Sequence, residues 1–207
     1  MLMRILFVIL LSAACGVLLA GPWIDWPFPP GQIGLVLMLA AALVLRRYWA
    51  QRATQRGDEP GEPEREVWHG LASTSLIGAQ LATALYLAGP GLALHSAQAS
   101  ALGRTTWTLI AGAVASWFIL HRREVPRDER DLAIAAHAQR LSSQVLVALV
   151  VALALLLGFT PPTWLAPMSH VFLAHLLLLS LVLASLAHHA LQLWGYRDDA
   201  SGRDGAG

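Results

Sequence analysis

The chain has 207 residues, of which 56% are hydrophobic and only 13% charged, and its net charge is +1. A near-neutral charge argues against a nucleic-acid partner, because neutralising phosphates requires a concentrated basic surface. Since the apolar residues gather into long runs with short connections, no soluble domain of about 50 residues or more fits between them. We therefore expect an all-α, polytopic membrane helix bundle that forms a single integral membrane domain.

Six apolar runs follow one another along the chain, and each predicts a transmembrane helix, which needs roughly 20 mostly apolar residues. The expected spans cover about residues 1–20, 32–48, 67–89, 105–121, 141–160 and 171–194. The hydrophilic parts are a loop at 46–66, a charged amphipathic segment at 122–140 and a flexible tail at 196–207.

The first span also has features of a secretory signal, and Ser12-Ala13-Ala14-Cys15 approaches a lipoprotein cleavage box. The position three before Cys15 is Ser12, where such a box has Leu or Val, and five further spans follow. We expect an uncleaved helix, while cleavage and lipidation at Cys15 remain the alternative.

Arginine placement predicts the orientation, because arginine-rich loops stay in the cytoplasm. All 14 basic residues are arginines, and only Arg104 falls in a loop on the opposite side from the others. Six spans with both termini in the cytoplasm satisfy this bias, which indicates a multi-pass protein of a bacterial inner membrane. The lipid bilayer is the first expected partner, and arginines beside the helix ends favour anionic headgroups.

Small residues indicate how the helices pack, since close approach replaces the hydrophobic drive between helices in lipid. They recur every four residues in the third and fourth spans, which we expect to pack against each other: Gly70, Thr74, Gly78 and Ala82, then Thr108, Gly112 and Ser116. Gln80 lies near the middle of the third span and should face the bundle. A hydrogen bond to another helix is the expected role, and lining a ligand cavity is the alternative.

Catalytic motifs are absent from the sequence. It contains no His-Glu-x-x-His, no glycine-rich phosphate loop and no Gly-x-Ser-Gly turn. Because no Asp, Glu or Arg occupies the middle of a span, an ion-coupled carrier is also disfavoured. We predict no catalytic residue and favour a protein that is not an enzyme.

Histidine is the residue type through which this chain could bind a cofactor, because imidazole ligates haem and metals. His69, His188 and His189 fall at similar depth near the cytoplasmic ends of their spans. A haem or metal between His69 and either His188 or His189 is one hypothesis. Histidines near helix ends more often interact with the helix terminus or with headgroups, so we expect no cofactor.

Residues 127–144 carry the densest charge. Asp128, Glu129 and Asp131 follow Pro126 and fit the first turn of a helix, where carboxylates oppose the helix dipole. Arg130, His137 and Arg140 lie along one side of that helix. Exposed carboxylates beside arginines suit a solvated interaction segment better than an acid/base site.

The run Asp128-Glu129-Arg130-Asp131, followed by Ile134, Ala138 and an apolar span, resembles a group of predicted multi-span membrane proteins of unknown function in bacteria and archaea. These carry an Asp-Glu-Arg-x-x-x-Ile segment between helix pairs. The resemblance covers about residues 67–195, with the first two helices extra. It implies a cytoplasmic face that binds a partner, since some such proteins are thought to accompany transcription regulators. The leading hypothesis is thus a non-enzymatic membrane regulator or scaffold, and a haem- or metal-binding protein is the alternative.

Overall fold

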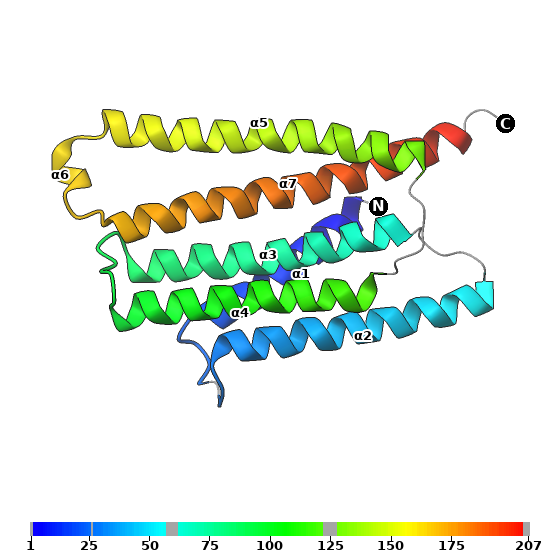
Figure 1. The fold of residues 1–207 in the computed structure, drawn as a ribbon, viewed down its shortest axis with the longest axis horizontal. Coiled ribbons are helices and arrows are strands. Elements are labelled where there is room, and N and C mark those ends of the chain that lie inside the picture. Colours follow the sequence, from blue (N-terminus) through cyan, green and yellow to red (C-terminus); the bar gives the residue numbers. More distant parts are fainter. Residues whose placement is uncertain (1, 26, 57–61, 122–127, 205–207) are drawn as a thin grey trace.

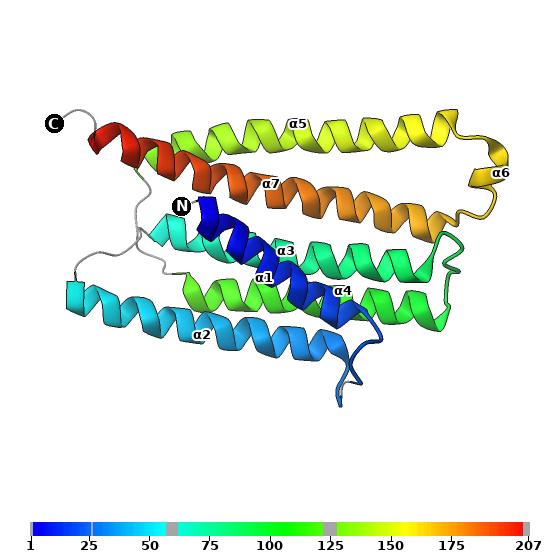
Figure 2. The same cartoon turned by 180° about the vertical axis from the view of Figure 1, so that it is seen from behind.

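The computed structural model of the protein describes residues 2–25, 27–56, 62–121 and 128–204. Within those ranges every regular element is a helix. In chain order these are α1 (Leu2–Ala20), α2 (Pro30–Arg56), α3 (Glu62–Ala88), α4 (Ala97–Leu120), α5 (Glu129–Phe159), the short α6 (Pro162–Leu165) and α7 (His170–Asp204). The long helices α2, α3, α4, α5 and α7 run lengthwise beside one another, and α1 crosses behind α3 (Figures 1 and 2). The start of α1 and the end of α7 lie toward the same end of the bundle (Figure 1).

Five of the described helices are long and apolar enough to cross a membrane: α1, α2, α3, α5 and α7. This finding agrees with a multi-pass membrane protein by the length and composition of its helices, with one fewer candidate than the six spans expected. The difference is α4, whose first half carries Gln98, Arg104 and three threonines. These polar residues lower the mean hydropathy of α4, although its second half is apolar.

Several boundaries differ from the expected ones because helices continue into the hydrophilic segments. α2 runs on to Arg56 and α3 begins at Glu62, so helix replaces most of the predicted loop at 46–66. α7 likewise continues to Asp204 through most of the predicted flexible tail. The parts of these predictions at residues 1, 57–61, 122–127 and 205–207 lie outside the described residues.

α3 is the central helix of the bundle. It packs against α1, α4 and α7, while α2 packs mainly on α4 and α5 mainly on α7. Half of the membrane-spanning window of α3 is buried, against 6% of that of α5. Each of the three buried apolar clusters contains α3 residues: Ile77 in the first, Leu81 in the second and Leu71 in the third. The rest of the fold is therefore assembled around α3.

Glycines mark the closest contacts between helices. A Cβ on Gly16 of α1 would lie 2.2 Å from the Leu76 carbonyl oxygen of α3, so α1 and α3 meet backbone to backbone. The small residues of α3 face α7, because Gly70 meets the His189 ring and Gly78 meets Val182. Gly112 of α4 faces Leu35 of α2. α3 and α4 do lie against each other, but their glycine faces point to other helices.

Polar side chains supply the α3–α4 contact. Thr106 of α4 donates a hydrogen bond to the Gln80 side-chain oxygen at 3.2 Å, and Gln80 is only 1% exposed. Arg46 of α2 donates to the Ile119 carbonyl near the end of α4. The described residues thus form hydrogen bonds between helices at two levels of the bundle, of which the Thr106–Gln80 bond is buried and the Arg46–Ile119 bond is exposed.

Replacing Gly16 by alanine is expected to separate α1 from α3, because the added methyl group meets backbone that cannot rotate away. We expect Gly16→Ala to lower the free energy of unfolding by about 1–3 kcal/mol, as overpacking does. Thermal unfolding in detergent measures this change. The control is Gly103→Ala, where no atom lies within 4 Å of the added Cβ, and which should be neutral or stabilising by up to about 1 kcal/mol. Equal effects of both substitutions would contradict the close α1–α3 contact.

Candidate functional site

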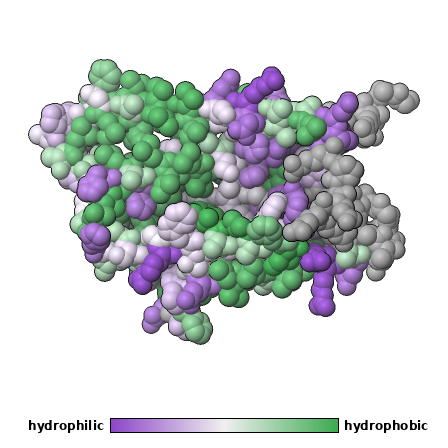
Figure 3. Space-filling model, in the orientation of Figure 1, coloured by the Kyte–Doolittle hydropathy of each residue, from purple (hydrophilic) through white to green (hydrophobic). Residues whose placement is uncertain are grey.

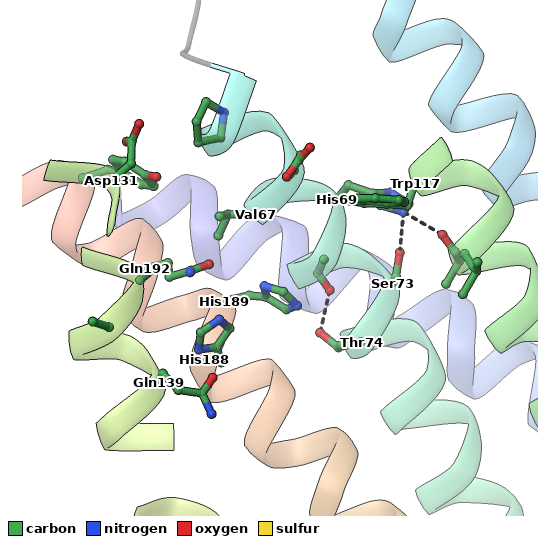
Figure 4. Close-up of a pocket in the computed structure, with 18 of the residues that line it drawn as sticks. Val67, His69, Ser73, Thr74, Trp117, Asp131, Gln139, His188, His189 and Gln192 are labelled. Carbon is green, nitrogen blue, oxygen red and sulfur yellow. Dashed lines mark hydrogen bonds between the residues drawn. The ribbon is translucent and has the colours of Figure 1, made fainter. Parts of the chain in front are cut away.

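A cavity of about 680 Å³ lies between α3, α4, α5 and α7. It lies at the end of the bundle where α3 and α5 begin and where α4 and α7 finish, and Figure 4 shows its lining. Its volume falls within the roughly 300–1,000 Å³ that is typical of small-molecule sites. Its polar lining residues are Glu66, His69, Ser73, Thr74, Asp131, Gln139, His188, His189, Gln192 and Tyr196.

His69 belongs to the α3–α4 contact on one side of the cavity. Its Nε2 lies 3.2 Å from the Ala113 carbonyl oxygen, and it lies 3.3 and 3.1 Å from the hydroxyls of Ser73 and Ser116. A carbonyl accepts only, so this contact assigns the proton to Nε2. Ser73, one helical turn along α3, bonds to the ring as Figure 4 shows, and Ser116 comes from α4, so the ring is fixed between the two helices. His69 is therefore already satisfied by the protein.

His188 and His189 have a different environment. They are consecutive on α7, and their ring centroids lie 5.4 Å apart with the rings inclined at 66°. The Nδ1 atom of each ring is buried and has no hydrogen-bond partner in the described part of the protein. Buried polar atoms almost always have a partner, and leaving one unpaired costs about 1–3 kcal/mol. Both residues line the cavity, but their Nδ1 atoms are covered by protein atoms, so a ligand would reach these nitrogens only if the rings turn.

Gly70 allows the His189 ring to approach α3. A Cβ at position 70 would lie 2.4 Å from Cε1 and 2.5 Å from Nε2 of His189, so any other residue there would displace the ring. The small residue at position 70 therefore creates space for an imidazole. Thr74, one turn further, donates its hydroxyl to the Gly70 carbonyl and also lines the cavity.

The mouth of the cavity carries two carboxylates, each with its own partner. Glu66 of α3 pairs with Nδ1 of His121, which stacks on Trp117 at a centroid distance of 4.4 Å. Asp131 of α5 receives the Asp128 N–H, and the Asp128 side chain accepts the Asp131 N–H at 2.7 Å. This reciprocal pair is a capping box at the start of α5. Among the described residues, no arginine lines the cavity.

The charged segment of α5 contributes to the cavity in part. Asp131 and Gln139 line it, whereas Asp128, Glu129, His137 and Arg140 are exposed. Arg130 lies over the Tyr196 ring of α7, with its guanidinium carbon 6.0 Å from the ring centroid. The carboxylates that we assigned to a helix start do cap α5, and one of them also borders the cavity.

All three candidate histidines, His69, His188 and His189, line this one cavity. Within the described residues, however, no three His, Cys, Asp or Glu side chains converge in a way that could hold a metal ion. Sequence reasoning did not find Gln139, Gln192 or Tyr196, since each fits an ordinary helix surface. The His188-His189 doublet was the available signal, because two adjacent imidazoles in an apolar span are unusual.

Comparisons of the chain with models of known protein families, with curated proteins and with solved structures give no match. The resemblance to membrane proteins with an Asp-Glu-Arg-x-x-x-Ile segment therefore stays a prediction.

Because its Nδ1 is buried without a partner in the described residues, His188 should lower the stability of the ligand-free protein. We expect His188→Leu to raise the free energy of unfolding of ligand-free protein by about 1–3 kcal/mol, since it removes a buried atom without a partner. Chemical or thermal unfolding in detergent is the measurement. His175→Leu is the matched control on the same helix: its Nδ1 donates to the Val171 carbonyl at 2.7 Å, so this substitution should lower stability. A His188→Leu protein less stable than the unsubstituted one would contradict the assignment.

Proposed function

We propose that the chain is a membrane protein that binds a small, membrane-soluble ligand in the cavity of α3, α4, α5 and α7. It communicates the presence of that ligand to a protein partner through its cytoplasmic segments. The observation that carries the proposal is that His188 and His189, whose Nδ1 atoms have no partner among the described residues, both line this cavity. In this proposal the protein is a non-enzymatic regulator, and the two histidines bind the ligand.

The proposed topology has six spans, with both termini in the cytoplasm of a bacterial cell. The one-sided distribution of arginines supports it. α4 would be the sixth span, because its 24 residues reach about 36 Å at 1.5 Å per residue and it runs antiparallel beside α3 (Figure 1). The cavity then opens near the cytoplasmic face.

The arrangement of α5 suggests how a ligand would be reported. α5 packs mainly on α7, and in its first turns it faces α3 and α4 across the cavity. A bound molecule would therefore bridge α5 to the central helix α3. Because the start of α5 carries the exposed Asp128, Glu129, His137 and Arg140, a small change in its position would alter the surface offered to a partner or to anionic headgroups.

A haem-binding protein is the second candidate, favoured by the three imidazoles around one cavity. The hydrogen bonding fits it less well. A ligating histidine almost always donates its second N–H to a carbonyl, carboxylate or water, and the buried Nδ1 atoms of His188 and His189 have no such acceptor in the described part of the chain. His69 would have to give up its Nε2–H contact with Ala113.

The ligand proposal is tested by purifying the protein gently from native membranes and analysing what is bound. Organic extraction with mass spectrometry should return a small molecule in near-stoichiometric amount from the unsubstituted protein and from His175→Leu. The same molecule should be strongly depleted in His188→Leu and His189→Leu. An absorption spectrum of the same samples separates the two candidates, since an intense Soret band that disappears with these histidines would establish haem. Protein that carries no small molecule in any form would refute ligand binding.

The orientation is tested by labelling single cysteines with a reagent that does not cross the membrane, in protein whose Cys15 is replaced by alanine. A cysteine at exposed Ala133 of α5 should react only after the cells are opened. The matched control at exposed Ala93, in the α3–α4 connection, should react in intact cells. The reverse pattern would invert the topology.

A further inference from the structure

The chemical character of the cavity wall narrows the class of ligand. We infer that the cavity binds a neutral, lipid-soluble ring compound with carbonyl or hydroxyl oxygens, of the quinone and quinol class. Its oxygens would hydrogen-bond to the imidazole rings of His188 and His189, which would turn to present a nitrogen to the cavity. This inference rests on the proposed function and adds the identity of the ligand.

The first argument is hydrogen bonding. A neutral imidazole nitrogen donates in one tautomer and accepts in the other. Other uncharged groups on the wall are hydroxyls and amides, which can both donate and accept: Ser73, Gln139, Gln192 and Tyr196. Thr74 can only accept, because its hydroxyl donates to the Gly70 carbonyl. A quinone presents only acceptors, whereas a quinol also presents donors. A wall made of groups that reverse their role suits a ligand that exists in both forms.

The second argument is charge. The two acidic groups among the lining residues, Glu66 and Asp131, lie at the mouth; no described arginine lines the cavity, and Arg130 beside it lies over the Tyr196 ring. A phosphate or carboxylate would meet like charge in a medium of low dielectric, where repulsion is strong. This disfavours anionic lipids, and it disfavours haem, whose carboxylates would have to lie either at this mouth or in the apolar interior.

The third argument is depth. His189 packs at the level of Gly70, which is one helical turn beyond Glu66 and therefore about 6 Å deeper. A cation held by the mouth carboxylates would lie above these imidazoles. A neutral oxygen can hydrogen-bond to the rings at this depth without bringing a charge into the bundle, which is the less costly arrangement.

The fourth argument is shape and surface. The rest of the wall is apolar, with Val67, Ile77, Val114 and Leu132, and Trp117 adds a flat aromatic surface. Such a wall accommodates a ring and the beginning of an apolar tail within about 680 Å³. Around it, apolar side chains cover the middle of α5 and α7, while polar ones gather toward the start of α5 (Figure 3). A ligand dissolved in the bilayer would therefore meet this part of the protein directly.

The test uses the full chain, purified in detergent, freed of endogenous ligand by exchange and checked for a single gel-filtration peak. Ubiquinone-1, a short-tailed benzoquinone, and its reduced form are titrated by calorimetry or equilibrium dialysis. A prenyl alcohol with the same tail controls for partitioning into detergent. We expect saturable binding of the quinone and of the quinol, and none of the alcohol.

Substitutions locate the binding. His188→Leu and His189→Leu should each weaken the quinone about tenfold or more, as expected for a lost hydrogen bond in an apolar site. His175→Leu, on the same helix but outside the cavity, should leave affinity unchanged. Since a variant can fold poorly, a second measurement uses the unsubstituted protein: a light-activated azidobenzoquinone should label peptides that contain Ser73–Ile77 or Ala135–Gln139, and unlabelled ubiquinone-1 should compete.

Linear, non-saturating uptake, or affinity unchanged in both histidine variants, overturns the inference. Labelling confined to other parts of the chain overturns it too. The outcome is separable from the proposed function. If native extraction returns a different molecule that depends on His188 and His189, the ligand-binding role stands and the quinone class is wrong. If neither native extraction nor titration finds a ligand, both fall.

Discussion

The structure depends on one constraint of the membrane interior: a polar group that is removed from water must find its partner inside the protein. α3 meets this constraint for most of its length. Gln80 accepts a hydrogen bond from Thr106, His69 is tied to Ala113, Ser73 and Ser116, and Thr74 and Ser75 donate to carbonyls of their own helix. Against that background, the two unpaired nitrogens of His188 and His189 are informative, because they depart from a rule that their neighbours obey.

The close packing around α3 explains why the exceptions occur where they do. Gly16 brings α1 against one side of α3, and Gly70 and Gly78 bring α7 against another. α5 packs mainly on α7, and the space between its first turns and α3 remains as the cavity. His188 and His189, near the middle of α7, therefore face a volume that no side chain of α5 fills. The proposed ligand site thus lies where α5 leaves a gap beside α3.

Much of the helical architecture could be predicted from apolar run length, since the bilayer imposes a minimum on every span. The predicted runs at 1–20, 67–89, 141–160 and 171–194 correspond to α1, α3, α5 and α7. Helix ends were harder to predict, because arginine and glutamate residues also form helices in water, so a helix need not end where the apolar run ends. α2 and α7 accordingly continue well past the last apolar residue.

Packing partners were less accessible to sequence reasoning. The four-residue rhythm of Gly70, Thr74 and Gly78 shows that a helix lies close, but it does not show which one, and the partner is α7 in place of α4. For the site, the sequence indicated His69, His188 and His189 at one depth. It did not reveal that His69 would be satisfied by its neighbours while the doublet would not, because this depends on the position of Ser116 on another helix.

The length of α5 has a mechanical consequence. Its 31 residues extend about 46 Å, whereas a bilayer core is about 30 Å thick. The apolar part of α5, at about 141–160, is about 30 Å long and matches the bilayer, so the first turns, with Glu129 and Arg140, project from the hydrocarbon. Because these turns continue the same helix, a displacement of α5 inside the membrane would be carried rigidly to a charged segment in water.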